Sequence, residues 1–349
     1  MIEIAHSEIG DHRRPFIIAE MSGNHNQSLD RALALVDAAA DAGADAVKLQ
    51  TFTADTMTLD SANAEFTIQN KSSLWQGQSL YKLYEQAHTP WEWHAPIMQH
   101  AKARGLVCFS SPFDSSAVDF LESLDVPAYK IASFECIDLP LIRKVALTGK
   151  PMIISTGRAT IAEIDDAVRT AHENGCKDLV LLKCTSTYPA TPENTHVRTI
   201  PHMRELFGCA TGLSDHTMGL GASVAATALG AVVIEKHFTL RRADGGVDAA
   251  FSLEPEELKQ LVIETERAWL SLGAIHYGPT EAEVTGRTRR RSLYIVADMH
   301  KGDILTAENM RAIRPGLGLS PKFQDIVLGM RVTQNISAGT PLSWSLLKD

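Results

Sequence analysis

The sequence has little cysteine and no long apolar run. Its five cysteines are an odd number and include no C-x-x-C pair, which argues against a disulfide framework and against a zinc site built from thiolates. No stretch is long and apolar enough to span a membrane, and the N-terminal segment "MIEIAHSEIGDHRRP" lacks the basic and then apolar pattern of a secretory signal. We therefore expect a cytoplasmic protein with reduced thiols and no membrane partner.

Positive charge is also in short supply. The chain has 33 Lys and Arg residues against 42 Asp and Glu residues, which gives a net charge of -9 at pH 7. This sign disfavours nucleic acid and acidic membrane surfaces as partners. An anionic substrate would therefore have to be bound by a local cluster of basic groups.

The chain does have a series of short apolar runs separated by segments with helical spacing. Its 349 residues and 44% hydrophobic content leave room for one large α/β domain and a smaller second one. Eight runs rich in Val, Ile, Leu and Ala are predicted strands, at residues 16–20, 46–51, 106–111, 128–133, 151–156, 179–184, 210–215 and 232–237.

Between most of these runs the sequence predicts a helix. In "SLDRALALVDAAADAGA", apolar residues from Leu29 to Ala39 fall near one helical face, and Gly43 ends the helix. Buried strands that alternate with crossover helices pair in parallel. Eight such units predict a (β/α)8 TIM barrel, which we place at residues 1–275.

One gap between predicted strands is too long for a simple crossover. It runs from Thr51 to Leu106, and we expect a loop excursion over the mouth of the barrel followed by a helix from about Pro90. The last barrel helix is expected in "SLEPEELKQLVIETERAWLSLG", with Pro255 in its first turn. Its predicted buried stripe consists of Leu258, Leu261, Val262, Thr265, Ala268, Trp269 and Leu272.

A polar linker is predicted at residues 276–291. It carries the run Arg289–Arg291, which could bind phosphate, but a short charge run on a linker is usually a solvated face, and we interpret it so. From residue 292 to 349 we expect a small β-rich domain. Its segments 297–306 and 334–343 share one pattern with equivalent turn glycines, which predicts a duplicated strand-turn-strand unit.

Polar side chains collect at the carboxyl ends of the predicted strands, where TIM barrels carry their chemistry. A single serine there usually caps a helix, but many polar groups converging on one mouth predict a functional site. The residues are Glu20, Asn24, Lys48, Gln50, Ser110, Ser111, Lys130, Ser133, Glu135, Ser155, Thr156, Lys183, Thr185, Ser186, Ser214, Asp215, His216, Glu235, Lys236 and His237.

Two histidines in this set predict a metal site. His216 and His237 end adjacent strands, and two neutral imidazoles completed by oxygen donors describe an open site for a divalent ion such as Mn²⁺, with Mg²⁺ or Co²⁺ as alternatives. Two unrelated hydrogen-bonding histidines are the competing interpretation. The acidic neighbours Asp215 and Glu235 favour the metal, because acidic groups orient ligands and attract cations.

A ring of lysines and serines predicts an anion site in the same mouth. Lys48 and Lys130, with Ser111, Ser133, Ser155 and Ser214, suit a small molecule that carries phosphate and carboxylate groups. The competing hypothesis is a lysine that forms a Schiff base, as in aldolases. The position of the lysines does not decide between the two.

The ordered blocks "AEMSGNHNQSL", "AVKLQT", "FSSPFD", "YKIASFE", "IISTG", "KCTSTYP", "GLSDHT" and "VIEKHF", with "IRPGLG" in the last module, resemble the sialic acid synthase family over essentially the whole chain. The resemblance implies an enzyme that condenses phosphoenolpyruvate with an N-acetylated amino-sugar aldehyde, a carbon–carbon bond-forming transferase. It also implies that the C-terminal module is an antifreeze-like SAF domain, swapped across a homodimer to cover the partner's active site.

The resemblance implies roles for individual residues. His216 and His237 would bind the divalent metal, while phosphoenolpyruvate would be bound by Lys48, Ser111, Lys130, Ser133, Ser155, Ser186 and Ser214. Facing the sugar or its reacting oxygen would be Glu20, Gln50, Glu135, Tyr188, Glu235 and Asp248, with Arg314 from the neighbouring chain. Glu20 or Glu235 would handle the proton, and Lys48 and Lys130 would stabilise the leaving phosphate.

Two positions depart from the usual family pattern. Phe134 replaces a glycine and Ser186 replaces an asparagine, and together with the excursion around "SSLWQGQSLYKLYEQAHTPWEWH" they resemble the pseudaminic acid synthase branch. The acceptor of that branch is a 6-deoxy sugar with two acetamido groups, which a bulky apolar wall would suit. A Schiff-base lyase and a non-catalytic sugar-binding or ice-binding protein are the rival functions.

The alternation of side chains along a strand sorts the last block. Glu235 and His237 are two residues apart and should face the same side, whereas Lys236 should face the other. We therefore expect Lys236 to be a structural partner rather than a site residue.

Overall fold

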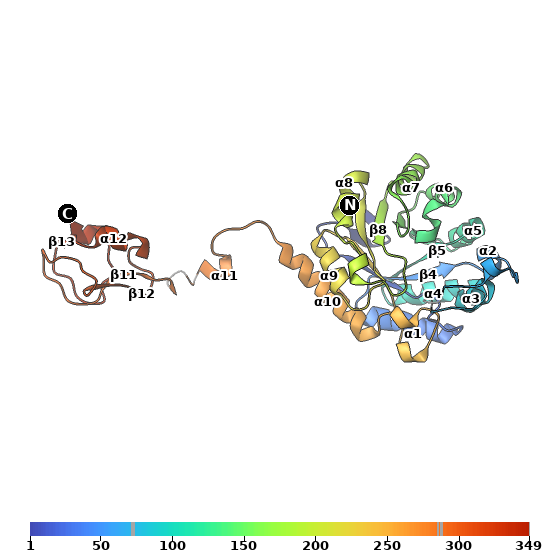
Figure 1. Ribbon diagram of the computed structural model, residues 1–349, viewed down its shortest axis with the longest axis horizontal. Coiled ribbons are helices and arrows are strands. Elements are labelled where there is room, and N and C mark those ends of the chain that lie inside the picture. The colour runs from blue at the N-terminus through green and yellow to red at the C-terminus, as the bar shows by residue number, and fades with distance from the viewer. Residues whose placement is uncertain (71–73, 285, 287–288, 349) are drawn as a thin grey trace. The chain divides into compact units, whose positions relative to one another are not determined.

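The computed structural model describes residues 1–70, 74–284, 286 and 289–348. It divides into two compact units, residues 1–273 and 274–349 (Figure 1). The linker at residues 276–291 stays a prediction, and its Thr285, Arg287 and Thr288 lie outside the described residues, as do residues 71–73 of the excursion.

The first unit is a closed barrel of eight strands, in the order β10, β3, β4, β5, β6, β7, β8, β9. Each neighbouring pair is parallel, so the predicted (β/α)8 barrel is confirmed, and the predicted strand ends agree with the observed ones to within two residues. The strands are β3 (Phe16–Glu20), β4 (Ala46–Thr51), β5 (Val107–Pro112), β6 (Tyr129–Ile131), β7 (Met152–Ser155), β8 (Leu179–Cys184), β9 (Ala210–Ser214) and β10 (Val233–His237).

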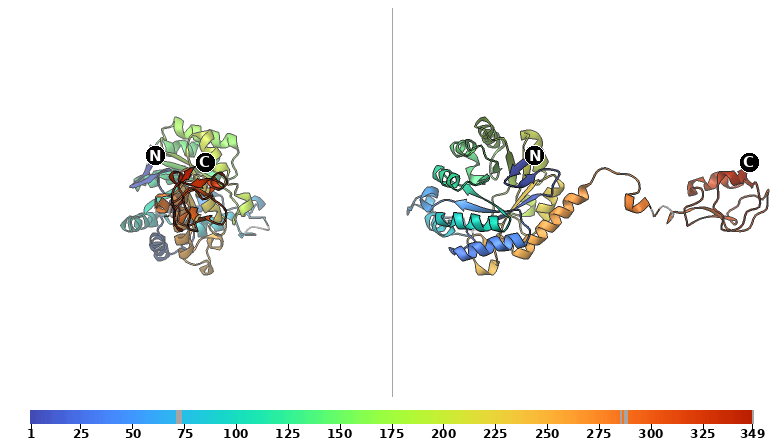
Figure 2. Two further views of the ribbon diagram at one scale, coloured as in Figure 1. Left: turned by 90° about the vertical axis from the view of Figure 1, so that its left-hand side faces the viewer. Right: turned by 180° about the vertical axis from the view of Figure 1, so that it is seen from behind.

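Helices surround the strands of the barrel (Figures 1 and 2). Side chains fix several of their first turns, as where Ser28 accepts a hydrogen bond from the backbone N–H of Arg31, and where Thr160 and Glu163 form a capping box. The long helices are α1 (Leu29–Asp41), α4 (Trp91–Ala103), α5 (Ser115–Ser123), α6 (Leu139–Ala146), α7 (Ile161–Glu173), α8 (Thr199–Phe207), α9 (Gly221–Ala228) and α10 (Pro255–Leu272).

Short helical turns fill the connections between the long elements. Among its described residues, the predicted excursion between β4 and α4 holds two of them and the eight-residue helix α3 (Leu80–Ala87), and α4 begins directly after Pro90, as expected. The short turns are α2 (Ala54–Met57), η1 (Ala64–Phe66), η2 (Ser133–Ile137), η3 (Pro192–Asn194), η4 (Arg242–Asp244) and η5 (Ala249–Phe251).

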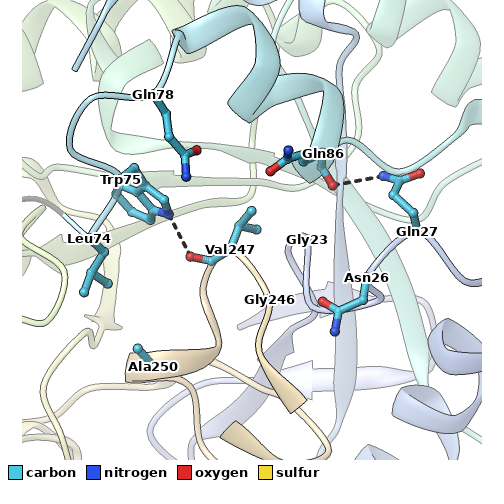
Figure 3. Close-up of a pocket in the computed structure, with 10 residues that line it drawn as sticks. All are labelled: Gly23, Asn26, Gln27, Leu74, Trp75, Gln78, Gln86, Gly246, Val247 and Ala250. Carbon is cyan, nitrogen blue, oxygen red and sulfur yellow. Dashed lines mark hydrogen bonds between the residues drawn. The ribbon is translucent and has the colours of Figure 1, made fainter. Parts of the chain in front are cut away.

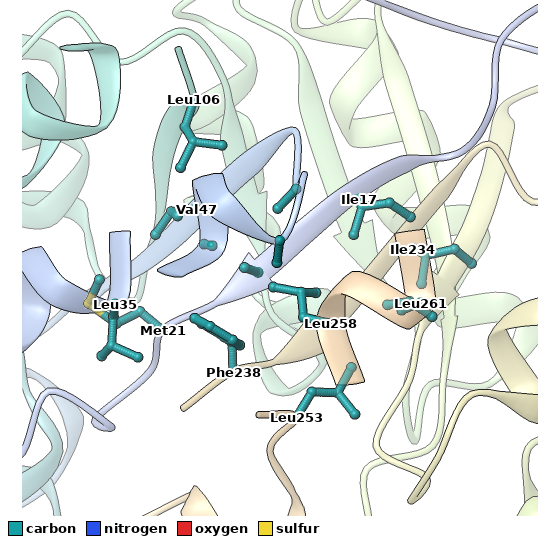
Figure 4. Packing of buried hydrophobic residues seen from close by; sticks show 14 of the residues in the cluster. Ile17, Met21, Leu35, Val47, Leu106, Ile234, Phe238, Leu253, Leu258 and Leu261 are labelled. Atoms are coloured by element: carbon teal, nitrogen blue, oxygen red, sulfur yellow. The ribbon is translucent and has the colours of Figure 1, made fainter. Parts of the chain in front are cut away.

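Apolar side chains between the strands and the helices form the outer core. In Figure 4, Leu35 of α1 and Leu258 and Leu261 of α10 pack in one cluster with Ile17 and Ile234 of the strands. Each of these leucines is fully or almost fully buried, so truncation to alanine would cost about 2–5 kcal/mol. The predicted stripe of α10 is one turn too long, because Leu272 in its last turn is 49% exposed.

A hairpin that the sequence did not suggest lies at the N-terminus. Strands β1 (Ile2–Ile4) and β2 (Ser7–Ile9) pair antiparallel. Their isoleucines join the inward-facing side chains of the barrel in one buried cluster, which includes Phe16 and Phe109. The hairpin therefore closes the end of the barrel opposite the strand carboxyl ends, and the functional groups can open only at the other end.

The second unit is a small module with its own apolar core. The two copies of the repeated pattern bond to each other reciprocally, because the backbone N–H groups of Met299 and Ile336 each donate to the carbonyl oxygen of the other. The N–H of Lys301 donates to Asn335 and that of Ala338 to Asp298, at equivalent positions. The predicted duplication is thus present, but as facing turns rather than as two regular hairpins.

The strands of this module are short. Among its described residues they are β11 (Ser292–Ile295), β12 (Met310–Ile313), β13 (Arg331–Val332) and β14 (Leu347–Lys348), with the turns η7 (Pro321–Phe323), α12 (Gln324–Val327) and η8 (Trp344–Leu346); α11 (Glu281–Val284) precedes them. The arginines 289–291 are exposed, as a solvated face would be.

None of the helices in the described parts of the chain is both long and apolar enough to cross a membrane. The cytoplasmic location stays a prediction.

Candidate active site

One cavity of about 520 Å³ opens at the carboxyl ends of the barrel strands. It is lined by every residue to which the family resemblance gives a role except Ser111 and Arg314. The other polar residues predicted at the strand ends do not line it: Asn24, Ser110, Thr156, Lys183, Thr185, Asp215 and Lys236. Ser111 accepts a hydrogen bond from the lining residue Lys48, and Arg314 is an exposed residue of the second unit. The predicted residues in the lining are Glu20, Lys48, Gln50, Lys130, Ser133, Glu135, Ser155, Ser186, Tyr188, Ser214, His216, Glu235, His237 and Asp248.

Lys48 lies between two buried carboxylates. Its ammonium group contacts Glu20 closely and lies 3.8 Å from Oε1 of Glu235. Burial lowers the pKa of Lys48, but the two carboxylates more than offset this and the net shift is upward. Burial raises the pKa of Glu20, and the charge of Glu235 adds to the rise against the opposing effect of Lys48. Lys48 therefore stays a cation at the floor of the cavity.

Lys130 supplies a second cation to the floor. Its Nζ donates to Oγ of Ser155 at 2.7 Å and lies 3.8 Å from Oε1 of Glu235, which also accepts from Ser214 at 3.3 Å. Burial lowers the pKa of Lys130. Burial alone would raise the pKa of Glu235, but Lys130 and Lys48 outweigh it and the net shift is downward. The other oxygen of Glu235, Oε2, has no hydrogen-bond partner among the described residues.

Hydroxyls and a backbone N–H group form a small cradle beside Lys130. Oγ of Ser133 accepts from the N–H of Gly157 at 3.1 Å. A Cβ atom on Gly157 would lie 2.2 Å from Oγ of Ser186 and 2.6 Å from Oγ of Ser133, so a glycine is required for the three groups to converge. The two hydroxyls can donate to a phosphate or carboxylate, with the ammonium of Lys130 in the same cavity, while the N–H group of Gly157 fixes the position of Ser133.

The two predicted metal ligands face one another. The rings of His216 and His237 have centroids 5.2 Å apart, and Nδ1 of His237 is buried without a hydrogen-bond partner in the described part of the chain. Burial, followed by the charge of His216, lowers the pKa of His237 far below its usual value, so its ring is neutral. A neutral imidazole with an unpartnered nitrogen fits a metal ligand.

His216 is oriented by contacts on its other nitrogen. Nδ1 donates to the carbonyl oxygen of Thr185 at 3.0 Å and lies 3.8 Å from Sγ of Cys184, which leaves Nε2 for the cavity. The residues present therefore fit a divalent ion held by two imidazoles. Within the described residues, no group of three or more His, Cys, Asp or Glu side chains is placed to hold a metal ion.

The structure corrects the role of Asp215. The aspartate lies behind the histidines, where its carboxylate accepts from Lys236, Thr217 and Ser223 at 2.7–3.0 Å. Side chains alternate along a strand, and because Ser214 and His216 face the cavity, Asp215 faces away from it. The expectation for Lys236 is confirmed, since its ammonium also donates to the carbonyl oxygens of Thr217 and Gly219.

Carboxylates and an aromatic ring complete the polar part of the wall. Asp248 lies 3.6 Å from Nδ1 of His237 and accepts a close hydrogen bond from Ser22. The ring of Tyr188 is tilted by 52° against that of His216, with ring centroids 4.5 Å apart. Burial raises the pKa of Glu135 to about 7, and its Oε2 has no partner among the described residues.

One side of the cavity is apolar, and sequence reasoning largely missed it. Only Phe134 of this wall was singled out, and it lies at the rim, 53% exposed, with the Arg158 guanidinium 5.2 Å from its ring centroid. Most of the wall comes from the excursion, whose unusual length was the available signal. The excursion contributes Phe52, Met57, Ile68, Trp75, Leu80, Leu83 and Tyr84, while Phe113 follows β5 and Val247 lies in the β10–α10 connection.

Comparisons with known proteins show which families this chain resembles. The pattern that defines the NeuB family matches residues 35–277, and the SAF domain pattern matches residues 290–348. A pseudaminic acid synthase from Helicobacter pylori is 44% identical, over 94% of this chain and 96% of that protein. An N,N'-diacetyllegionaminic acid synthase from Legionella pneumophila is 36% identical, over 94% of this chain and 93% of its own length.

A solved structure agrees with both the sequence match and the fold. It is the N-acetylneuraminic acid synthetase of Leptospira borgpetersenii in complex with citrate, which is 30% identical. The match covers 82% of this chain and 94% of that one, with a TM-score of 0.73.

Proposed function

The chain belongs to the NeuB family, and from that membership we propose that it is a pseudaminic acid synthase. The proposed reaction joins phosphoenolpyruvate to the aldehyde of 2,4-diacetamido-2,4,6-trideoxy-altrose and releases phosphate. The observation that carries the proposal is the 44% identity to the Helicobacter pylori enzyme along almost the whole chain, against 36% for the legionaminic acid enzyme. The legionaminate and N-acetylneuraminate reactions are the alternatives.

The cavity offers a separate place for each reactant. We propose that Lys48, Lys130 and the cradle at Gly157 bind the phosphate and carboxylate groups of phosphoenolpyruvate. Ser111, Ser133, Ser155, Ser186 and Ser214 would add hydroxyl donors. The sugar would lie between this floor and the outer wall, against Gln50, Glu135, Tyr188 and Asp248. Binding both substrates in contact converts a bimolecular reaction into an effectively unimolecular one.

The bonds change in a defined order in the proposed reaction. The methylene carbon of phosphoenolpyruvate forms a bond to the aldehyde carbon, water adds to the adjacent carbon, and the tetrahedral intermediate loses phosphate by carbon–oxygen cleavage. Glu20 or Glu235 moves the proton, and Lys48 and Lys130 stabilise the leaving phosphate. A divalent ion held by His216 and His237, for which we propose Mn²⁺ with Mg²⁺ or Co²⁺ as alternatives, would supply Lewis-acid polarisation of the aldehyde.

The test is phosphate release from phosphoenolpyruvate with three acceptors in parallel. These are N-acetylmannosamine, 2,4-diacetamido-2,4,6-trideoxymannose and the corresponding altrose. The proposal expects the highest kcat/KM with the altrose, and a higher value with either of the others would assign a different branch. Borohydride trapping with pyruvate tests the lyase alternative, because only a Schiff-base lysine would be covalently modified.

We also propose a homodimer in which Arg314 reaches the partner's site. Two variants can test this, Arg314→Ala in the second unit and His237→Ala in the barrel. In a swapped dimer, a hybrid of the two variants contains one barrel with its histidine and an intact arginine from the partner. Activity that returns when the two inactive variants are refolded together supports the exchange, whereas activity that stays absent contradicts it.

A further inference from the structure

The apolar wall of the active-site cavity also borders a second cavity. This neighbouring space has a volume of about 470 Å³ and is lined by residues that include Leu74, Trp75, Gln78 and Ala250 (Figure 3). Trp75 and Val247 line both cavities. These two residues are therefore a partition between the active site and the neighbouring space.

The partition is held by a hydrogen bond and by tight packing. Nε1 of Trp75 donates to the carbonyl oxygen of Val247 at 2.9 Å, a bond visible in Figure 3. A Cβ atom on Gly23 would lie 2.5 Å from Cγ2 of Val247 and 3.0 Å from Cα of Ala87, so the valine packs against backbone with no spare room. The indole therefore has a fixed position over the cavity.

Aromatic contacts relate Trp75 to the two histidines. In the proposed reaction the aldehyde lies at His216 and His237. The ring centroid of Tyr188 is 4.5 Å from that of His216 and 6.1 Å from that of Trp75. An extended sugar with its aldehyde at the histidines would therefore reach Trp75 with its opposite end. Ile68 and Leu80 line the same cavity.

The chemistry of the indole limits what it can accept there. An indole ring has a single hydrogen-bond donor, and in Trp75 that donor is already engaged by Val247. The ring presents only carbon to the substrate, and a hydroxyl placed against it would lose hydrogen bonds to water without replacement. A methyl group in the same place would gain from burial.

We propose that Trp75 is a specificity-determining residue that selects acceptors carrying a methyl group, rather than a hydroxymethyl group, at the end remote from the aldehyde. This inference rests on the proposed function and names the part of the acceptor that the excursion recognises. The charged floor of the cavity contacts the aldehyde end of the acceptor and so cannot distinguish a methyl from a hydroxymethyl group at the other end. The apolar wall of the excursion can make this distinction.

The experiment compares two acceptors that differ only at carbon 6. They are 2,4-diacetamido-2,4,6-trideoxy-altrose and its counterpart with a 6-hydroxyl group, and the readout is the ratio of their kcat/KM values for phosphate release. The wild type should favour the 6-deoxy sugar by about tenfold or more. Trp75→Gln, which places amide donors and acceptors at the wall, should lower this ratio by about tenfold with an unchanged KM for phosphoenolpyruvate.

Three further variants test the apolar character of the wall separately from the hydrogen bond to Val247 and from the neighbouring cavity. Trp75→Phe keeps an apolar ring but removes the bond to Val247, and it should retain the preference. Leu74→Ala is the matched control, because Leu74 lines only the neighbouring cavity and should leave both rates unchanged. Ile68→Thr, which places a hydroxyl on the same wall and removes one carbon, should also lower the ratio and covers the case in which Trp75→Gln does not fold.

The outcomes distinguish the inference from the function on which it rests. A wild type that turns over both sugars with no preference, or a folded Trp75→Gln protein with the wild-type ratio, would overturn the role of Trp75 while leaving the synthase intact. A wild type that releases phosphate with neither sugar, nor with the other two acceptors, would contradict the proposed function and the inference together.

Discussion

Lys236 and Asp215 form an ion pair, with Nζ and Oδ2 3.0 Å apart, on the face of the barrel wall opposite the active-site cavity. Both side chains are buried, and the pair ties the end of β10 to the turn that follows β9. His216 and His237 lie one residue further along these two segments. The pair therefore supports the two candidate metal ligands from behind without touching the substrate.

The first prediction concerns the stability of this pair. Lys236→Met should lower the free energy of unfolding by about 3–5 kcal/mol, because it leaves the Asp215 carboxylate buried and unpaired. The double variant Asp215→Leu/Lys236→Met should lose less free energy of unfolding than the two single variants lose together, because neither buried charge remains. Urea unfolding of the four proteins gives the coupling energy. A single variant that costs less than about 1 kcal/mol would contradict the buried pair.

The second prediction concerns the metal. Mn²⁺ binding, measured by calorimetry on chelator-treated protein, should be lost in His237→Ala and in His216→Ala, and phosphate release should fall with it. His202→Ala removes an exposed histidine outside the cavity and is the control for both readouts. Chelation of the wild type should abolish activity, and Mn²⁺ should restore it. Full activity after chelation would rule the metal out.

The third prediction concerns the cradle at Gly157. In Gly157→Ala the new methyl group displaces the hydroxyls of Ser133 and Ser186, so the KM for phosphoenolpyruvate should rise by about tenfold or more, as expected when one hydrogen bond to a charged group is lost. The fold should remain, because the glycine does not have a positive φ. Gly221→Ala, where the new Cβ meets nothing within 4 Å, is the matched control. An unchanged KM would remove the cradle from the phosphoenolpyruvate site.

Much of this site could be predicted from the sequence because strand geometry is periodic. Side chains alternate every residue, so Glu235 and His237 had to share a side, and parallel strands had to bring Glu20 and Lys48 to the same end. The same rule applied to β9 would have turned Asp215 away from the cavity. Its pairing with Lys236 was missed because sequence proximity to His216 was taken for spatial proximity.

The apolar wall and the N-terminal hairpin could not be predicted in the same way. Trp75 lies in an excursion without helical or strand periodicity, and its contact with Val247 joins residues 172 positions apart in the chain. The isoleucines of β1 and β2 fill the barrel end only because the barrel leaves that end open. Both features depend on tertiary packing, which local sequence patterns do not encode.

The fourth prediction concerns the pH dependence of stability and a buried histidine outside the active site. Nε2 of His94 lies 2.8 Å from Oγ1 of Thr51, and Nδ1 lies 3.3 Å from the carbonyl oxygen of Pro90. Burial lowers the pKa of His94 to about 4, against the opposing effect of the Pro90 carbonyl and the nearby Glu92 charge. Over the pH range in which His94 begins to bind a proton in the unfolded protein, its side chain therefore stays neutral in the folded protein.

The sign of the effect follows from this difference. Below the unfolded pKa of 6.5 the unfolded chain binds a proton that the folded protein does not, so stability falls as the pH drops from about 6.5 toward 4. The shift corresponds to about 3 kcal/mol at full extent. His94→Gln, which keeps a hydrogen-bond acceptor for Thr51 but cannot titrate, should flatten the pH dependence over this range, while His202→Gln should not. Urea unfolding at pH 7.0, 6.0 and 5.0 measures the slopes. Burial also lowers the pKa of His25, so part of the slope should remain in His94→Gln. A slope equal to that of the wild type would show that His94 is protonated in the folded state as readily as in the unfolded one.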